Sequence, residues 1–146
     1  MMVVVPDASV VLKWVLQRED EPDSPVALRV LQEYLEERIE IRLPSLWRYE
    51  VGNILALKQP GLASESMETL LSYQFLEETL NRDYCLAVLR FMRDLQGISF
   101  YDASYHVLAQ RMQGVYLTAD NDYVKKARRK AHIALLSNWN PPAHAR

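Results

Sequence analysis

Two acidic residues follow short apolar runs, a position from which they could do chemistry together. Asp7 comes directly after the run 2–6, and Asp120 comes directly after the run 115–119. Both acids are therefore expected at the C-terminal ends of short strands, the edge at which open α/β sheets bind their ligands. This pattern predicts that the two carboxylates face one site.

Two further acids lie on predicted helices and interrupt their apolar faces. Glu50 falls in the middle of one helical stripe, and Asp102 falls three residues before another. Removing an ionised carboxylate from water costs on the order of several kcal/mol unless the group is paired, hydrogen-bonded or bound to a metal. The stripes are Leu43, Leu46, Trp47, Ile54 and Leu57 around Glu50, and Tyr105, Leu108, Ala109 and Met112 after Asp102.

These four acids, Asp7, Glu50, Asp102 and Asp120, are predicted to share a metal site. Each also has a simpler explanation, since Asp7 could cap the helix that begins at Ala8 and most acids in any chain are solvated. Oxygen ligands without Cys or His nearby suit Mg²⁺ or Mn²⁺, and Mg²⁺ usually keeps several waters and recruits substrate phosphate. Phosphate chemistry is therefore expected.

Hydroxyl and cationic side chains near the acids extend the candidate site. Thr118 and Ser9 could orient a carboxylate or a water molecule. The net charge is −2, yet from residue 121 onward the chain has six Lys or Arg and a single acid, Asp122. This basic stretch could hold phosphates beside the acids, or it could be a solvated helix face. The candidate phosphate-binding residues are Lys125, Lys126, Arg128 and Arg129.

Length and composition predict one soluble domain spanning 1–146 and located in the cytoplasm. The chain has 146 residues, of which 49% are hydrophobic and 25% charged, and no apolar run long enough to cross a membrane. The single Cys85 cannot form an intramolecular disulfide. The three histidines lack metal-ligand spacing, which argues against zinc.

Short apolar runs alternate with helical patterns, which predicts an α/β fold with a parallel sheet flanked by helices. The segment 64–80 is expected to be helical, with an apolar face that is either core or a partner-binding surface. Gly114 is expected to end a helix in the C′ position, and 138–146 is expected to be a loose tail. The expected strands are 2–6, 39–43, 115–118 and 133–136; the expected helices are 8–17, 24–37, 45–59, 64–80, 84–95, 102–113 and 121–131, with an acidic loop at 18–23.

Taken in order, the segments around the four acids resemble the successive motifs of PIN-domain ribonucleases, specifically the VapC-type toxins. Each motif is short and weak alone, but the ordered set is specific and covers essentially the whole chain. The matching segments are Val4-Val5-Pro6-Asp7-Ala8-Ser9-Val10-Val11-Leu12-Lys13-Trp14, Pro44-Ser45-Leu46-Trp47-Arg48-Tyr49-Glu50-Val51-Gly52-Asn53, Tyr101-Asp102-Ala103-Ser104-Tyr105 with Leu108-Ala109, and Leu117-Thr118-Ala119-Asp120.

This resemblance implies a three-layer α/β/α sandwich and an endoribonuclease that depends on Mg²⁺ or Mn²⁺. It implies that Asp7, Glu50 and Asp102 form the acidic triad and that Asp120 is the fourth acid, with Thr118 beside it and Asp122 a candidate fifth. It also implies an RNA substrate, a homodimer, and a cognate antitoxin whose C-terminal segment lies in a groove near the site.

Two other functions remain open from the residues alone. A small-molecule phosphohydrolase could use Asp7 as a covalent nucleophile, although such an aspartate commonly works with a second acid two residues on, where this chain has Ser9. A non-catalytic interaction module could use the acids to hold a structural ion or a partner's arginine.

Overall fold

Five parallel strands form the centre of the molecule. A computed structural model describes residues 1–16 and 23–143. Neighbouring strands pair in the order β3-β2-β1-β4-β5, and every pair is parallel. Strands β1 and β4 are almost wholly apolar, as expected of parallel strands covered on both faces, whereas β2 carries Glu40 and Arg42. The strands are β1 (Met2–Pro6), β2 (Ile39–Pro44), β3 (Leu76–Glu78), β4 (Val115–Thr118) and β5 (Ile133–Leu135).

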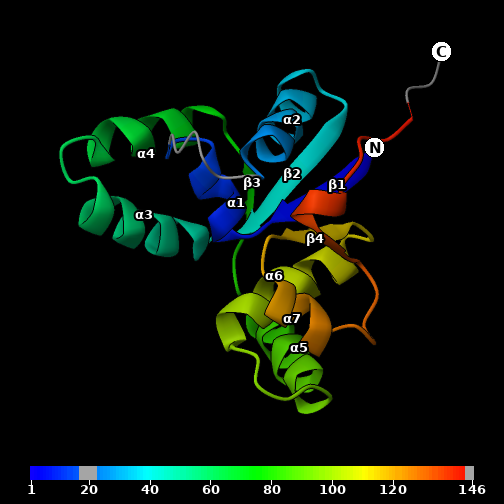
Figure 1. Cartoon of the computed structure of the whole chain (residues 1–146). Helices are drawn as coiled ribbons and strands as arrows, with labels where there is room; N and C mark the ends of the chain where they lie inside the picture. Colours follow the sequence, from blue (N-terminus) through cyan, green and yellow to red (C-terminus); the bar gives the residue numbers. More distant parts are fainter. Residues whose placement is uncertain (17–22, 144–146) are drawn as a thin grey trace.

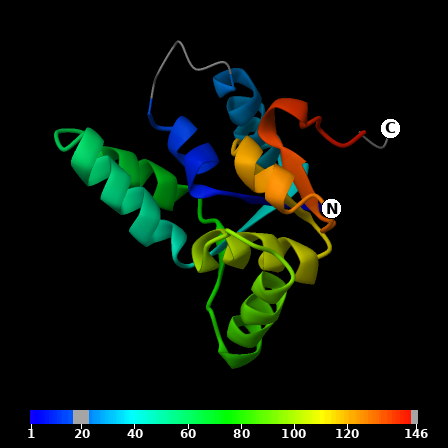
Figure 2. The same cartoon turned by 60° about the horizontal axis from the view of Figure 1, so that its bottom comes forward.

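Helices cover both faces of this sheet and confirm the predicted α/β class. In Figure 1, α1 and α2 lie above the sheet, while α6 lies below it and α5 packs against α6 at the bottom of the view. Helices α3 and α4 form a hairpin that extends to the left in Figure 2, and α5 projects at the bottom of the same view. The helices are α1 (Ala8–Lys13), α2 (Ser24–Leu35), α3 (Trp47–Lys58), α4 (Ala63–Ser72), α5 (Arg82–Arg93), α6 (Phe100–Arg111) and α7 (Asn121–Lys126). None of the helices in the described ranges is long and apolar enough to cross a membrane.

The predicted helix 64–80 is wrong in its second half, because the chain turns there and enters the sheet as β3. Helix α4 ends at Ser72, and Gln74 adopts a left-handed conformation with φ 55°. Phe75 then packs between aromatic rings, with its centroid 5.3 to 5.9 Å from those of its neighbours. The rings around Phe75 belong to Trp14, Tyr34, Trp47 and Tyr73. The expected apolar face is divided, since Leu70 and Phe75 are buried while Leu71 and Leu76 are exposed.

The C-terminal region also differs from its prediction. Helix α7 ends at Lys126 instead of continuing to residue 131. The tail is anchored through residue 139, because a short 3-10 helix (Leu136–Asn138) follows β5 and the side chain of Trp139 is buried. Residues 144–146 of the expected tail lie outside the described residues.

Smaller corrections concern helix ends. Helix α1 ends at Lys13, and residues 14–16 of its expected span form a turn. Residue 17 and most of the expected acidic loop lie outside the described residues. The left-handed residue after α6 is Gln113, with φ 53°, so Gly114 is not the helix-terminating residue. Leu57, expected on the buried stripe of α3, is 73% exposed. The strand–helix junctions that carry the acids are unaffected.

Candidate active site

Asp7 is held in one orientation by its neighbours at the end of β1. Its Oδ1 accepts hydrogen bonds from Ser9 Oγ at 2.5 Å and from the Val10 backbone N–H at 3.0 Å, so Asp7 also caps α1. Its Oδ2 accepts from Thr118 Oγ1 at 2.5 Å. Burial raises the pKa of Asp7, and these hydrogen bonds only partly offset that effect. The capping role that the sequence allowed for Asp7 is therefore observed, and it is compatible with a place for the carboxylate in the candidate site.

Glu50 reaches the same region from the first turn of α3. Its Oε1 accepts a hydrogen bond from the Tyr105 hydroxyl of α6 at 2.7 Å. Tyr105 is almost completely buried, so its hydroxyl needs this partner. Burial raises the pKa of Glu50, and the charges of Asp102 and Asp7 raise it further.

Asp102 and Asp120 enter from the starts of two helices. Ser99 caps α6 by accepting the Asp102 backbone N–H at 3.0 Å, which places Asp102 in the first turn. Asp120 caps α7 by accepting from Tyr123 N at 3.1 Å, and its own backbone N–H donates to Thr118 Oγ1 at 3.0 Å. Burial raises the pKa of Asp102, followed by the charge of Asp7 and, more weakly, that of Asp120.

Asp7, Glu50 and Asp102 therefore form one electrostatically coupled cluster at the C-terminal edge of the sheet, with Asp120 at its margin. Each additional negative charge disfavours ionisation of the others, and a cation would relieve that repulsion. Among residues 1–16 and 23–143, no three or more acidic, His or Cys side chains already form a group that could hold a metal ion. The donor chemistry nevertheless fits Mg²⁺ or Mn²⁺, because Mg²⁺ takes only one or two carboxylates and completes its shell with water and phosphate.

The remaining predicted residues lie around this cluster. Lys126 is close enough to Asp102 to offset part of the rise in its pKa. Lys125, Arg128 and Arg129 are exposed, as is Asp122 on the first turn of α7. Their assignment as substrate-binding or supporting residues stays a prediction.

Two residues that position the acids were not singled out from the sequence. Tyr105 was assigned to the apolar stripe, although a buried tyrosine needs a partner for its hydroxyl, and that need could have pointed to an acid. Ser99 stands three residues before Asp102, the spacing of a helix cap, and this signal was available.

The fold and the carboxylate cluster define a class of α/β protein with an acidic site at the C-terminal edge of a parallel sheet. Residues 4–129 match the PIN domain family, so this chain belongs to the PIN domain family. No curated protein matches the chain.

Solved structures of similar fold cover most of the chain. The toxin–antitoxin complex from Klebsiella pneumoniae has a TM-score of 0.69 at 14% identity, covering 91% of this chain and 97% of that one. VapBC2 from Rickettsia felis, bound to a DNA fragment from its promoter, has a TM-score of 0.67 at 12% identity, covering 92% and 97%. VapC20 from Mycobacterium tuberculosis, a sarcin–ricin loop cleaving toxin, has a TM-score of 0.61 at 14% identity, covering 84% and 93%. At these identities the likeness establishes the fold.

Proposed function

We propose that this protein is a VapC-type endoribonuclease that depends on Mg²⁺ or Mn²⁺ and acts in the cytoplasm as the toxin of a toxin–antitoxin pair. The observation that carries this proposal is the coupled cluster of Asp7, Glu50 and Asp102, whose pKa values are all raised by burial. Membership of the PIN domain family and the toxin–antitoxin context of the similar structures support it.

In this proposal the chain's own residues hold the acids ready for a cation and a phosphodiester. Thr118 and Ser9 fix Asp7, and Tyr105 fixes Glu50. Asp7, Glu50 and Asp102 would hold the metal, with Asp120 as the fourth acid and Asp122 as a further supporting residue. When bound, such an ion polarises the phosphodiester and lowers the pKa of a coordinated water.

Covalent catalysis by Asp7, as in a phosphohydrolase, is less well supported. Asp7 Oδ1 already accepts two hydrogen bonds and Oδ2 accepts a third, so the carboxylate is oriented by the protein rather than left free for attack. Two residues on, Ser9 donates to it where a second acid would be needed.

A protein partner is supported by exposed apolar side chains on the α3–α4 hairpin. Tyr49, Leu57 and Leu62 are 82%, 73% and 52% exposed. A cavity of about 360 Å³ lies between the two helices, lined in part by Leu55 and Met67. These features would suit an antitoxin segment close to Glu50, and a homodimer is part of the same proposal. Sedimentation of the chain alone and with its antitoxin would test both assemblies.

The deciding experiment is cleavage of a mixed RNA pool by purified protein with Mn²⁺, compared with EDTA and with Asp7→Asn. Asparagine can still accept the Val10 N–H, so the variant keeps the cap while losing the charge. The matched control is Asp83→Asn, which removes an exposed acid on α5. Cleavage that needs both Mn²⁺ and Asp7 supports the proposal, whereas cleavage retained by Asp7→Asn contradicts it.

A further inference from the structure

The exposed face of α5 carries two arginines near its end, Arg90 and Arg93, and the charge of Arg93 acts weakly on the neighbouring Asp94. Arg90 and Arg93 are exposed, and neither forms an ion pair within the ranges that the structure describes. Three arginines on or near β2, in contrast, are held by glutamates. Those pairs are Arg38–Glu33, Arg42–Glu78 and Arg48–Glu77. The two α5 guanidinium groups therefore remain available to an external anion.

The end of α5 is joined to the basic segment 125–130. Lys130 Nζ donates to Asp94 Oδ2 at 2.9 Å and lies 5.3 Å from the centroid of the Phe91 ring. Lys130 is thus used internally, to fasten the segment against α5, while its basic neighbours stay exposed. The arginines of α5 and the cations of the segment consequently belong to adjoining surfaces.

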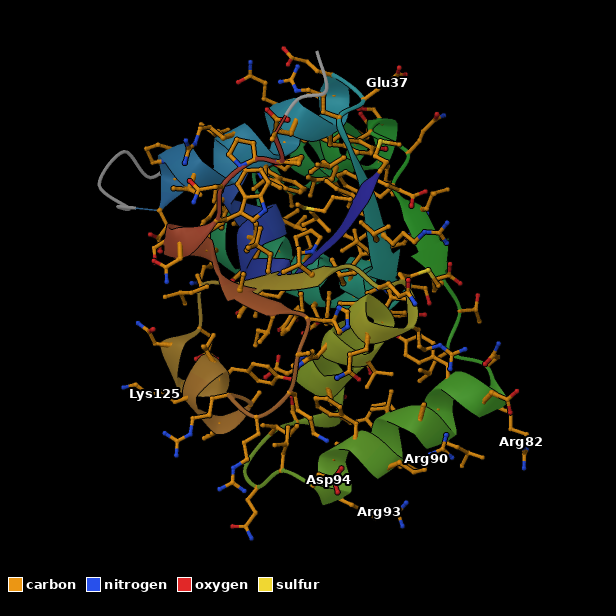
Figure 3. All side chains as sticks on the ribbon, turned by 90° about the vertical axis from the view of Figure 1, so that its right-hand side faces the viewer. Glu37, Arg82, Arg90, Arg93, Asp94 and Lys125 are labelled. Carbon is orange, nitrogen blue, oxygen red and sulfur yellow. The ribbon has the colours of Figure 1, made fainter. Side chains whose placement is uncertain are left out.

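Figure 3 shows how these cations lie on the outside of the molecule. Arg93 projects from the lower end of α5, Arg90 lies one turn earlier on the same helix, and Lys125 projects from α7 at the left of the view, in the lower half of the molecule. Arg82 projects from the opposite end of α5 and pairs with Asp83.

The same basic surface begins beside the acidic cluster. Lys126 Nζ donates to the Gly97 carbonyl oxygen at 3.1 Å, which ties α7 to the connection between α5 and α6. Burial raises the pKa of Asp102 most strongly, and the Lys126 ammonium partly offsets it. A continuous path therefore leads from Asp102 through Lys126 and the 125–130 segment to the end of α5.

Charge is distributed unevenly enough along the chain to favour this path for an anion. Residues 82–130 contain nine Lys or Arg and five Asp or Glu, a net charge of +4, although two of those acids belong to the candidate site. The rest of the chain contains eight Lys or Arg and fourteen Asp or Glu, a net charge of −6. A polyanion approaching the metal-free acidic cluster is repelled by it, so cations alongside would contribute to its affinity.

We propose that Arg90 and Arg93 extend the basic segment 125–130 into a track that binds the phosphate backbone of single-stranded RNA leading to the acidic cluster. This inference rests on the proposed ribonuclease function and adds to it the residues of α5. Guanidinium groups suit the task because their planar donors match phosphate oxygens in pairs.

The test compares two double variants that remove the same charge from different surfaces. Arg90→Gln/Arg93→Gln removes the proposed contacts. The control, Arg29→Gln/Arg82→Gln, removes one exposed arginine from α2, on the opposite side of the sheet in Figure 1, and one from the far end of α5. Binding of a fluorescent single-stranded RNA is measured over a series of KCl concentrations in EDTA, with the RNA checked for integrity afterwards.

The expected result is a weaker salt dependence for the Arg90/Arg93 variant alone. Each lost contact with a single strand lowers the slope of log K against log salt by about 0.7, so the pair lowers it by about 1.4. Equal slopes in both double variants overturn the proposal. If the Arg90→Gln/Arg93→Gln variant changes its oligomeric state but keeps the wild-type slope, the proposal is also overturned. Arg90 and Arg93 would then be assigned to a protein interface.

Failure of the track and failure of the nuclease proposal give different results. Wild-type protein that cleaves RNA with Mn²⁺ but binds it independently of Arg90 and Arg93 contradicts the track alone. Wild-type protein that binds RNA through these arginines without cleaving it contradicts the nuclease and leaves the track in place.

Discussion

Thr118 donates its hydroxyl to Asp7 Oδ2 at 2.5 Å, although 111 residues separate the two in the sequence. The same oxygen of Thr118 accepts the Asp120 backbone N–H at 3.0 Å. A single buried hydroxyl at the end of β4 therefore connects two of the candidate site acids, which lie just after the paired strands β1 and β4. The alignment of β1 with β4 is what brings these groups together.

Thr118→Val is expected to destabilise the protein and to reduce cleavage, because the shape is kept while the donor to Asp7 is lost. A hydrogen bond to a charged group contributes about 1.5 to 3 kcal/mol, and urea unfolding should report a loss of that order. Thr118→Ser retains the hydroxyl and serves as the control. If Thr118→Val were as stable and as active as Thr118→Ser, the hydroxyl would have no role in holding Asp7.

Tyr105→Phe is expected to shift the acidic limb of the pH–activity profile to higher pH. The Tyr105 hydrogen bond lowers the pKa of Glu50 against the larger, opposite effect of burial. Without this bond the pKa of Glu50 rises further, so Glu50 becomes ionised, as metal binding requires, only at higher pH. Mn²⁺ affinity measured against pH should show the same shift. Tyr101→Phe, on the same helix but with its ring 61% exposed, should leave both profiles unchanged.

Asp102→Asn is expected to abolish cleavage and yet stabilise the metal-free protein at neutral pH. Burial and the charge of Asp7 raise the pKa of Asp102 in the folded state. The resulting penalty on folding is absent at pH below the ordinary carboxyl pKa and develops as the pH rises through the raised value. In EDTA at pH 7.5 we expect Tm to increase by about 2 to 4 °C, which corresponds to roughly 1 kcal/mol.

The control for Asp102→Asn is Asp122→Asn, which removes an exposed acid from α7. Its Tm should stay close to that of the wild type. A decrease in Tm for Asp102→Asn in EDTA would mean that the carboxylate makes a stabilising contact and does not mainly repel its neighbours.

The sheet could be predicted from the sequence where a strand has its own apolar run. Strands β1, β2 and β4 meet that condition, and the acids at the ends of β1 and β4 follow from it. Strand β3 has only three residues, and its position depends on distant groups: Leu76 aligns with Arg42, and Phe75 packs against Trp47. No local periodicity reports such contacts, so the apolar residues before β3 were assigned to one long helix.

The candidate site could be predicted to a similar extent. Acids that interrupt an apolar pattern are visible in the sequence, and so is a contiguous basic segment such as 125–130. The bond between Tyr105 and Glu50 spans 55 residues and appears only in the fold. Arg90 and Arg93 lie far before that basic segment in the sequence, and the fold joins their helix to it through the contacts of Lys130 with Asp94 and Phe91.

Gly114→Ala is expected to destabilise the protein by more than about 2 kcal/mol, the scale of a forced backbone displacement in a packed region. A Cβ at this position would lie 2.3 Å from the Val3 carbonyl oxygen, so Gly114 allows β1 to approach the turn before β4. Gly61→Ala is the matched control, because a Cβ there has no neighbour within 4 Å. Equal urea midpoints for the two variants would contradict this role of Gly114.

His106 is fully buried on α6, and we expect it to make the protein sensitive to mild acid. Its ring nitrogens lie 2.8 Å from the Tyr123 hydroxyl and 2.8 Å from the Ala131 carbonyl oxygen. Burial lowers the pKa of His106 to about 4 from an ordinary value of 6.5. The carbonyl can only accept, so the neutral ring donates from Nε2 and accepts the Tyr123 proton at Nδ1.

Between pH 6.5 and about 4 the unfolded chain binds a proton at His106 that the folded chain does not, so stability falls as the pH falls through this window. The loss should approach the order of 3 kcal/mol at the acidic end. His106→Gln cannot titrate, so its unfolding free energy should change less with pH than that of the wild type. NMR titration of the wild-type imidazole provides an independent check, since a His106 that protonates near pH 6.5 without loss of structure would contradict its assignment as a buried neutral ring.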